Sequence, residues 1–139
     1  MFGRDLNKLP IWFDLKNECD IMNARRLNMK VVKKSAESVK LEPAHDGAGS
    51  RKLFVANDEV KNIQGITHGW LKAGGVFEWH KHDDCNEFMY VLKGSGVVRD
   101  EDGEYAFKVG DFFIFPLGVY HEQRNTGNET FEAVFIRTK

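Results

Sequence analysis

The segment 74–94 carries two histidines and one glutamate at a spacing that suits a pair of adjacent β-strands. On an extended strand, residues two apart share a face and lie about 6.7 Å apart, so His80 and His82 converge while Lys81 points away. After a short polar turn, Glu87 begins a run of aromatic and aliphatic residues that is typical of a strand. Because adjacent strands lie about 4.8 Å apart, the carboxylate of Glu87 is expected to reach the same point as the two imidazoles.

The segment 110–125 supplies a third histidine from another pair of strands. An apolar strand is expected over 111–115, followed by a turn with Pro116 and Gly118, and His121 then lies on the return strand. Three neutral imidazoles and one carboxylate suit a divalent first-row metal ion, such as Fe, Mn, Ni, Co, Cu or Zn. In a roughly octahedral shell this donor set leaves about two positions for water, substrate or oxygen. The expected ligands of this single ion are His80, His82, Glu87 and His121.

These two segments resemble the two sequence motifs of the cupin superfamily. The first motif, G(X)5HXH(X)4E(X)6G, is matched by Gly74, His80, His82, Glu87 and Gly94. The second motif, G(X)5PXG(X)2H(X)3N, is matched by Gly110, Pro116, Gly118, His121 and Asn125. Because every fixed position is filled, the resemblance implies an all-β fold, the double-stranded β-helix or jelly-roll barrel, with a metal site inside it.

The rest of the chain also has the pattern of a β-rich protein, and a jelly roll is an architecture that hides many strand edges in a short chain. Asp102-Gly103 indicates a tight hairpin turn. We expect residues 1–28 to form an N-terminal extension, with a strand or one short helix and a candidate dimer contact, and 29–139 to form the barrel. The expected strands are 29–33, 38–41, 51–55, 65–72, 76–82, 87–92, 96–100, 104–109, 111–115, 119–125 and 130–137.

Composition favours one compact domain and excludes several classes of partner. The chain has 139 residues, of which 42% are hydrophobic, enough to bury a core. Twenty basic and twenty-one acidic residues give a net charge of -1, which argues against nucleic acid and anionic membranes as partners. No apolar run approaches 18 residues, and the charged start of the chain does not match a signal peptide. With only Cys19 and Cys85, no disulfide scaffold is expected, so we predict a cytoplasmic protein.

Strand alternation predicts which side chains surround the ion. If Glu87 faces inward, Met89 and Val91 share its face, whereas Phe88, Tyr90 and Leu92 face the other side of the sheet. The same rule places Val119 and Gln123 beside His121, and Glu78 beside His80. Tyr90 joins the pocket only if the alternation slips at the turn. The expected pocket residues are Met89, Val91, Val119, Gln123 and Tyr90, and the candidate catalytic residues are Glu87, Glu78 and Gln123.

Several other polar residues are expected to have ordinary structural roles. His45 and His68 are not expected to bind the ion, because the four-donor set is already complete. Cys85 is interpreted as a loop thiol, and Asn125 as a residue that fixes a turn. No nucleophile elbow, phosphate-binding loop, dinucleotide fingerprint or HExxH helix occurs, so any catalysis is expected to use the metal.

The resemblance implies several functions and does not choose among them. Cupins similar to this chain include dioxygenases, isomerases or epimerases, lyases and decarboxylases, so the first hypothesis is a metal-dependent enzyme for a small oxygenated metabolite that chelates the ion. The alternative from another class is a cupin that only binds or senses a small molecule. A sugar-phosphate isomerase would need a convergent basic pocket, and the sequence shows no obvious convergence of Arg51, Arg99 and Arg124. Exposed aromatic residues opposite the metal face also predict a homodimer.

Overall fold

The structure is a computed structural model that describes residues 31–139. The chain separates into two units, residues 1–33 and 34–139, and every strand of the described residues belongs to the second unit. The expected N-terminal extension, 1–28, lies outside the described residues. No helix of the described residues is long and apolar enough to cross a membrane.

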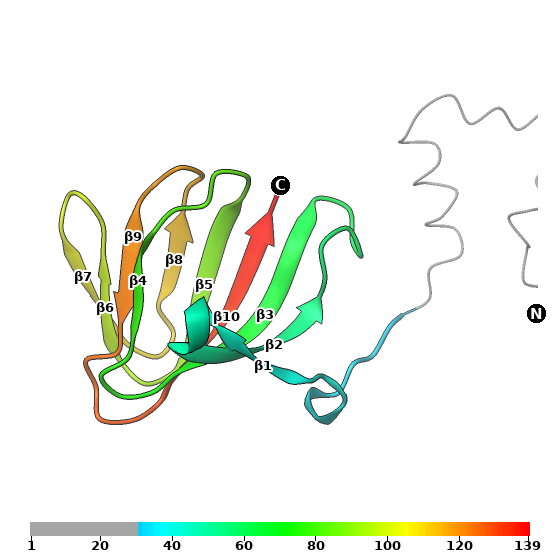
Figure 1. Ribbon diagram of the computed structural model, residues 1–139, viewed down its shortest axis with the longest axis horizontal. Helices are drawn as coiled ribbons and strands as arrows, with labels where there is room; N and C mark the ends of the chain where they lie inside the picture. The colour runs from blue at the N-terminus through cyan, green and yellow to red at the C-terminus, as the bar shows by residue number, and fades with distance from the viewer. Residues whose placement is uncertain (1–30) are drawn as a thin grey trace, which may run out of the picture. The chain divides into compact units, whose positions relative to one another are not determined.

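Ten strands and two short 3-10 turns make up the described part of the chain (Figure 1). The 3-10 turns are η2 (Ala36–Ser38) and η3 (His45–Gly47). The strands are β1 (Leu41–Ala44), β2 (Gly49–Val55), β3 (Ile63–Leu71), β4 (Val76–His80), β5 (Asn86–Lys93), β6 (Gly96–Arg99), β7 (Glu104–Phe107), β8 (Phe112–Phe115), β9 (His121–Arg124) and β10 (Phe131–Thr138).

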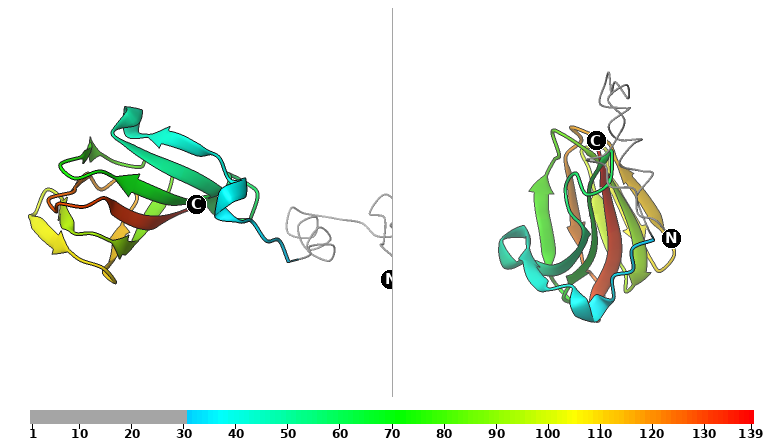
Figure 2. Two further views of the ribbon diagram at one scale, coloured as in Figure 1. Left: turned by 90° about the horizontal axis from the view of Figure 1, so that it is seen from below. Right: turned by 90° about the vertical axis from the view of Figure 1, so that its right-hand side faces the viewer.

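The strands form two antiparallel sheets that face each other (Figure 2). The larger sheet has the order β1-β2-β3-β10-β5-β8, and the smaller sheet has the order β4-β9-β6-β7. The last strand, β10, therefore lies between β3 and β5, in the middle of the larger sheet. This arrangement confirms the predicted all-β jelly-roll barrel.

Alternation along the strands builds the core between the two sheets. In β10, Phe131, Ala133 and Phe135 are buried, and the residues between them are partly exposed. The inward-facing residues of β3 are small at one end of the strand and large at the other. They are Gly65, Thr67, Gly69 and the fully buried Leu71. The buried core consists of Leu71, Phe77, Met89, Val91, Val98, Phe107, Phe115, Phe131, Ala133 and Phe135.

The strands expected from residue 51 onward are all present, with ends that agree to within about two residues. The expected strand 38–41 is wrong: η2 ends at Ser38, and β1 begins at Leu41. Ser38 Oγ donates a hydrogen bond to the Ser35 carbonyl at 2.8 Å, and such local bonds favour turns over strands. Of the expected strand 29–33, residues 31–33 are not in a strand and the others lie outside the described residues.

The outer face of β5 and β8 carries an apolar strip, which consists of the partly buried Phe88 and the exposed Tyr90, Leu92, Phe112 and Ile114. Phe88 pairs with Ile114, and Tyr90 pairs with Phe112, so these side chains form a continuous surface. Ile114 is 62% exposed and Phe112 is 55% exposed, and both lie on β8, which is the edge strand of the larger sheet. An exposed apolar edge strand tends to pair or to be covered by another chain.

We predict that this apolar strip is the contact surface of a homodimer. Ile114→Lys should then shift the protein from dimer to monomer, because burying the lysine charge between two subunits is costly. Analytical ultracentrifugation at micromolar concentration measures the change. Leu41→Lys, on the opposite edge strand β1, is the matched control and should leave the dimer intact. Sedimentation of the wild-type protein as a 16.0 kDa monomer would contradict the prediction.

Candidate metal centre

A β-bulge in β4 sets the orientation of His80. Phe77 pairs with Gln123 of β9, and His80 pairs with His121, so three steps along β4 correspond to two along β9. The extra residue lets both Phe77 and His80 face the interior of the barrel, although an ordinary strand would place them on opposite faces. The bulge thus supplies the core with Phe77 and the site with His80.

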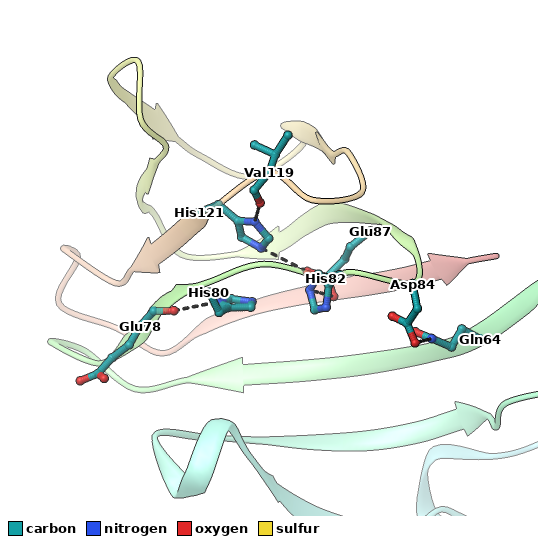
Figure 3. Close-up of polar contacts among 8 residues, drawn as sticks. All are labelled: Gln64, Glu78, His80, His82, Asp84, Glu87, Val119 and His121. Atoms are coloured by element: carbon teal, nitrogen blue, oxygen red, sulfur yellow. Dashed lines mark hydrogen bonds and ion pairs between the residues drawn. The ribbon is translucent and has the colours of Figure 1, made fainter.

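The same bulge corrects the prediction that Glu78 shares a face with His80. Glu78 and Trp79 both lie between the two inward-facing residues and are exposed. Figure 3 shows the Glu78 carboxylate pointing away from the three imidazoles. Only the backbone carbonyl of Glu78 contacts the site, where it lies 2.6 Å from His80 Nδ1.

The four expected ligands come together as one cluster (Figure 3). One donor atom of each residue lies within 4.8 Å of the donor atoms of the others. Glu87 lies between two of the imidazoles: Oε2 is 3.5 Å from His82 Nε2, and Oε1 is 3.9 Å from His121 Nε2. The cluster draws on β4, the turn after it, β5 and β9, so both sheets contribute. The described residues that form it are His80, His82, Glu87 and His121.

Backbone carbonyls fix two of the imidazole rings. His80 Nδ1 lies 2.6 Å from the Glu78 carbonyl, and His121 Nδ1 lies 3.0 Å from the Val119 carbonyl. A carbonyl only accepts, so Nδ1 carries the proton in the neutral ring and Nε2 keeps its lone pair. Metal-binding histidines are commonly oriented in this way by a hydrogen bond from the other ring nitrogen.

The Nε2 atoms of His80, His82 and His121 are buried and have no hydrogen-bond partner among the described residues. The nearest acceptor of His82, the Glu87 carboxylate, is 3.5 Å away, which exceeds the usual hydrogen-bond length. A buried polar atom without a partner costs about 1–3 kcal/mol, so three in one place need an explanation. Three lone pairs and one carboxylate that converge on one point fit a divalent cation.

Burial keeps the site in the protonation state that a metal requires. Loss of solvation lowers the pKa of His121 to about 4, although its bond to the Val119 carbonyl opposes this shift. Burial alone would raise the pKa of Glu87, but His82, His121 and Arg137 outweigh it and hold the pKa below its ordinary value. A neutral imidazole and an ionised carboxylate are the forms that bind metal ions.

His45 lies next to the cluster without belonging to it. Its ring stacks on Phe77 at a centroid distance of 4.3 Å and meets the edge of the His80 ring at 4.8 Å. Desolvation lowers the pKa of His45 to about 4. The residue lies in η3 with φ of 48°, in the left-handed region, so the β1–β2 turn presents its ring to the site.

The expected pocket residues lie in different parts of the structure. Met89 and Val91 share the inward face of Glu87, as predicted, but they belong to the hydrophobic core. Tyr90 is 45% exposed on the outer face of β5, so its expected place in the pocket is wrong. Val119 lies just before β9 and lines a second cavity of about 200 Å³ together with His121.

Gln123 lies on the inward face of β9, two residues beyond His121, as predicted. It is 1% exposed, and neither its amide nitrogen nor its amide oxygen has a hydrogen-bond partner among the described residues. A buried amide in this state requires a water molecule or a ligand as its partner. Gln123 therefore remains a candidate for contact with a bound molecule.

A cavity of about 210 Å³ opens beside the cluster and contains two arginines. Arg51 was considered from the sequence, and Arg137 was not. Alternation along β10 is the signal that could have found it, because Arg137 is two residues beyond Phe135 and shares the inward face of the core residues. The cavity is lined by Ala44, His45, Ser50, Arg51, Thr67, Gly69, Phe77, His82, Glu87, Phe135 and Arg137.

The other polar residues considered from the sequence have structural roles. Arg99 lies over the Trp79 ring at 5.4 Å, and Arg124 pairs with Glu122, so neither reaches the cavity. Asn125 fixes a turn as predicted, because its Nδ2 donates to two backbone carbonyls at 2.8 Å each. Cys85 is a buried thiol outside the donor cluster, and burial raises its pKa to about 11.

The part of the chain that carries this site matches a known protein family. Residues 70–137 match the family described as Cupin domain. The chain is 26% identical over 102 residues to an uncharacterized protein of Methanocaldococcus jannaschii, and the match covers 73% of this chain and 82% of that protein. It is 36% identical over 66 residues to an oxalate-binding protein of Thermotoga maritima, which covers 48% of this chain and 54% of the relative.

Solved structures show the same fold at low sequence identity. A protein of Thermotoga maritima described as a predicted oxalate decarboxylase superposes with a TM-score of 0.68 at 21% identity, covering 77% of this chain and 98% of that one. A cupin described as a sugar phosphate isomerase, from Silicibacter pomeroyi, superposes with a TM-score of 0.67 at 19% identity, covering 78% and 76%. These two matches show that the barrel is shared.

We predict that replacing His80, His82 or His121 by Ala reduces bound metal to a small fraction of the wild-type content. Each substitution removes one of four protein donors. Elemental analysis of protein purified without chelators measures the metal per chain. His68→Ala is the matched control, because His68 pairs with Glu132 outside the cluster, and it should keep full metal content. A triple variant at His80, His82 and His121 with wild-type metal content would refute the assignment.

A second prediction concerns the stability of the metal-free protein below neutral pH. Unfolded His121 takes up a proton near the reference pKa of about 6.5, whereas folded His121 does so only near about 4. The unfolded state therefore binds more protons between these values, and stability falls as pH falls through this window. Between pH 6 and 5 the free energy of unfolding should drop by about 1 kcal/mol more in the wild type than in His121→Gln.

Urea denaturation of both metal-free proteins at pH 6 and 5 provides the four free energies that this comparison requires. Titrating groups that do not interact with His121, including His45, contribute equally to both proteins and cancel in the difference. Equal losses of stability in the wild type and in His121→Gln would show that burial does not keep His121 neutral.

Proposed function

Because this chain belongs to the cupin superfamily, we propose that His80, His82, Glu87 and His121 bind one divalent transition-metal ion and that the protein is a metal-dependent enzyme for a small oxygenated metabolite. One observation carries this proposal: three buried Nε2 atoms without partners among the described residues converge with a carboxylate, and two of the four donors, His82 and Glu87, line an open cavity. A purely structural cluster would not need a cavity beside it. The cavity volume of about 210 Å³ suits a small molecule.

The residues around the cavity have separate tasks in this proposal. A divalent ion at the cluster would act as a Lewis acid toward the oxygens of a chelating ligand. The three imidazoles hold the ion, with His80 and His121 kept in place by backbone carbonyls. Gln123 lies outside the lining of this cavity, so its unpaired amide is a candidate to hydrogen-bond a buried water molecule beside the cluster rather than the ligand itself.

Glu87 is the candidate for proton transfer. It is the carboxylate that lines the cavity, and its lowered pKa keeps it ionised and able to accept a proton. Glu78 takes no part in this proposal, because the bulge in β4 leaves its side chain exposed and directed away from the cluster.

Two alternatives are supported by particular observations. A sugar-phosphate isomerase or epimerase is favoured by the two arginines in the cavity and by the likeness to the isomerase from Silicibacter pomeroyi. A protein that only binds its ligand is favoured by the similarity to the oxalate-binding protein of Thermotoga maritima. An oxygen-consuming enzyme would oxidise the bound ligand. An isomerase would rearrange the ligand without oxygen, and a binding protein would leave it unchanged.

We predict that the metal-loaded protein converts at least one member of a panel of small chelating metabolites. The panel contains α-hydroxy acids, α-keto acids, dicarboxylates and sugar phosphates, each tested with protein of known metal content. An oxygen electrode measures uptake, and NMR of the same samples measures isomerisation, carbon loss or elimination without oxygen. Substrate-dependent oxygen uptake indicates a dioxygenase, and conversion without uptake indicates an isomerase or lyase.

The metal-free triple variant of His80, His82 and His121 is the control for each reaction, and it should convert nothing. Saturable binding of a panel member to the metal-loaded protein, with no conversion detected by either method, would reject the enzyme and favour the binding protein. Equal conversion by the wild type and the triple variant would remove the metal from the proposal.

A further inference from the structure

Arg137 is positioned beside the cluster by strand pairing. In β10 it pairs with Glu87 of β5 on one side and with Gly65 of β3 on the other. Directly paired residues on one face have Cβ atoms about 4.5–5.5 Å apart, so Arg137 and Glu87 are immediate neighbours. The side chain of Arg137 therefore emerges into the same cavity as the metal ligand.

The guanidinium of Arg137 nevertheless makes no ion pair with Glu87. Among residues 31–139 it forms no ion pair and no side-chain hydrogen bond, although the Glu87 carboxylate is on the adjacent strand. It lies instead over Gly65, where a Cβ atom would be 3.0 Å from Nη2 and 3.6 Å from Nε. The absence of a side chain at residue 65 thus gives the guanidinium room beside the cavity.

Arg51 approaches the same cavity from β2. It pairs with Gly69 of β3, which again has no side chain to fill the space. Arg51 Nε donates a hydrogen bond to Glu42 Oε1 at 2.8 Å, which orients the guanidinium and leaves both of its Nη groups available. Arg51 and Arg137 therefore flank the inner face of β3, where Thr67 and Gly69 line the cavity and Gly65 lies against the Arg137 guanidinium.

With a divalent ion at the cluster, the charges around this cavity no longer balance. Glu42 offsets Arg51, and Glu87 is the acidic neighbour of Arg137, although the two side chains form no ion pair. A divalent ion at the cluster would exceed the single negative charge of Glu87, so it leaves the cavity positive. A positive cavity with guanidinium groups in its wall attracts an anionic ligand.

We propose that Arg137 and Arg51 form an anion-binding subsite, which holds the carboxylate or phosphate end of a ligand whose other end chelates the metal ion. This inference rests on the proposed metal-dependent function and adds the substrate class: a small, two-ended anion. The fork of guanidinium N–H donors matches both carboxylate and phosphate oxygens, so the two end groups share the same recognition chemistry. Both Thr67 and Ser50 add hydroxyl groups to the lining of this cavity.

The test compares ligands that share one chelating head and differ only at the remote end. Malate and lactate both present an α-hydroxy carboxylate, but malate ends in a carboxylate and lactate in a methyl group. Phosphoglycerate and glycerate form the corresponding pair for a phosphate end. Dissociation constants are measured by isothermal titration calorimetry on Co²⁺-loaded protein at constant ionic strength.

For the wild type we expect the doubly anionic member of at least one pair to bind about tenfold to a hundredfold more tightly than its partner. Preference for malate would identify a carboxylate end, and preference for phosphoglycerate a phosphate end. Arg137→Gln should remove most of this preference. Arg137→Lys keeps a charge but loses the fork, so it should retain part of the preference.

Two controls separate this inference from the proposed function. Arg99→Gln removes the same charge from outside the cavity and should keep the wild-type preference. Titration with Co²⁺ alone should give affinities that agree within a few-fold for the wild type and Arg137→Gln. Failure of the wild type to bind Co²⁺ would overturn the proposed function, whatever the arginines do.

Normal Co²⁺ binding with no preference in either ligand pair would overturn the anion subsite and leave the metal assignment standing. A full preference retained by Arg137→Gln would overturn the role of Arg137. If Arg137→Gln does not fold, Arg137→Lys and the wild-type ratio still decide the result. Arg51→Gln, measured in the same assay, should weaken binding of malate or phosphoglycerate and leave the binding of lactate and glycerate, which lack the second anionic end, unchanged.

Discussion

The bulge in β4 determines how the core and the site share one barrel. Without the extra residue, a strand that buries Phe77 would turn His80 outward, and the cluster would lose one of its donors. With it, Phe77 packs into the core while His80 stands directly opposite His121 of β9. A bulge interrupts the regular ladder, and here that irregularity turns His80 toward the donors from β5 and β9.

The rest of the centre depends on rigid support for rings that would otherwise rotate. The carbonyls of Glu78 and Val119 fix His80 and His121, and the Phe115 ring stacks on His121 at a centroid distance of 4.2 Å. Burial disfavours the charged imidazole and so keeps the lone pairs free. The same burial makes unpaired Nε2 atoms costly, so a cation that binds them would stabilise the site.

Sequence patterns predicted the barrel and the donor cluster because both depend on local spacing. Period-2 alternation placed Met89 and Gln123 on the inward faces of their strands, and the fixed motif positions brought the four donors together. The alternation rule failed for Glu78, because a bulge shifts the period and leaves no clear mark in the sequence. Arg137 was missed for another reason: alternation along β10 indicates that it faces inward, but only the pairing with Gly65 and Glu87 on other strands places it beside the cluster.

The inner face of β3 shows how one surface serves both stability and binding. One end carries Leu71, which is fully buried in the core, whereas Thr67 and Gly69 line the cavity and Gly65 lies against the Arg137 guanidinium. A Cβ at Gly69 would come within 2.9 Å of the Phe135 ring, so a larger residue would displace the core as well as fill the cavity. Small residues are therefore required where the sheet must leave room for a ligand, and large ones where it must exclude water.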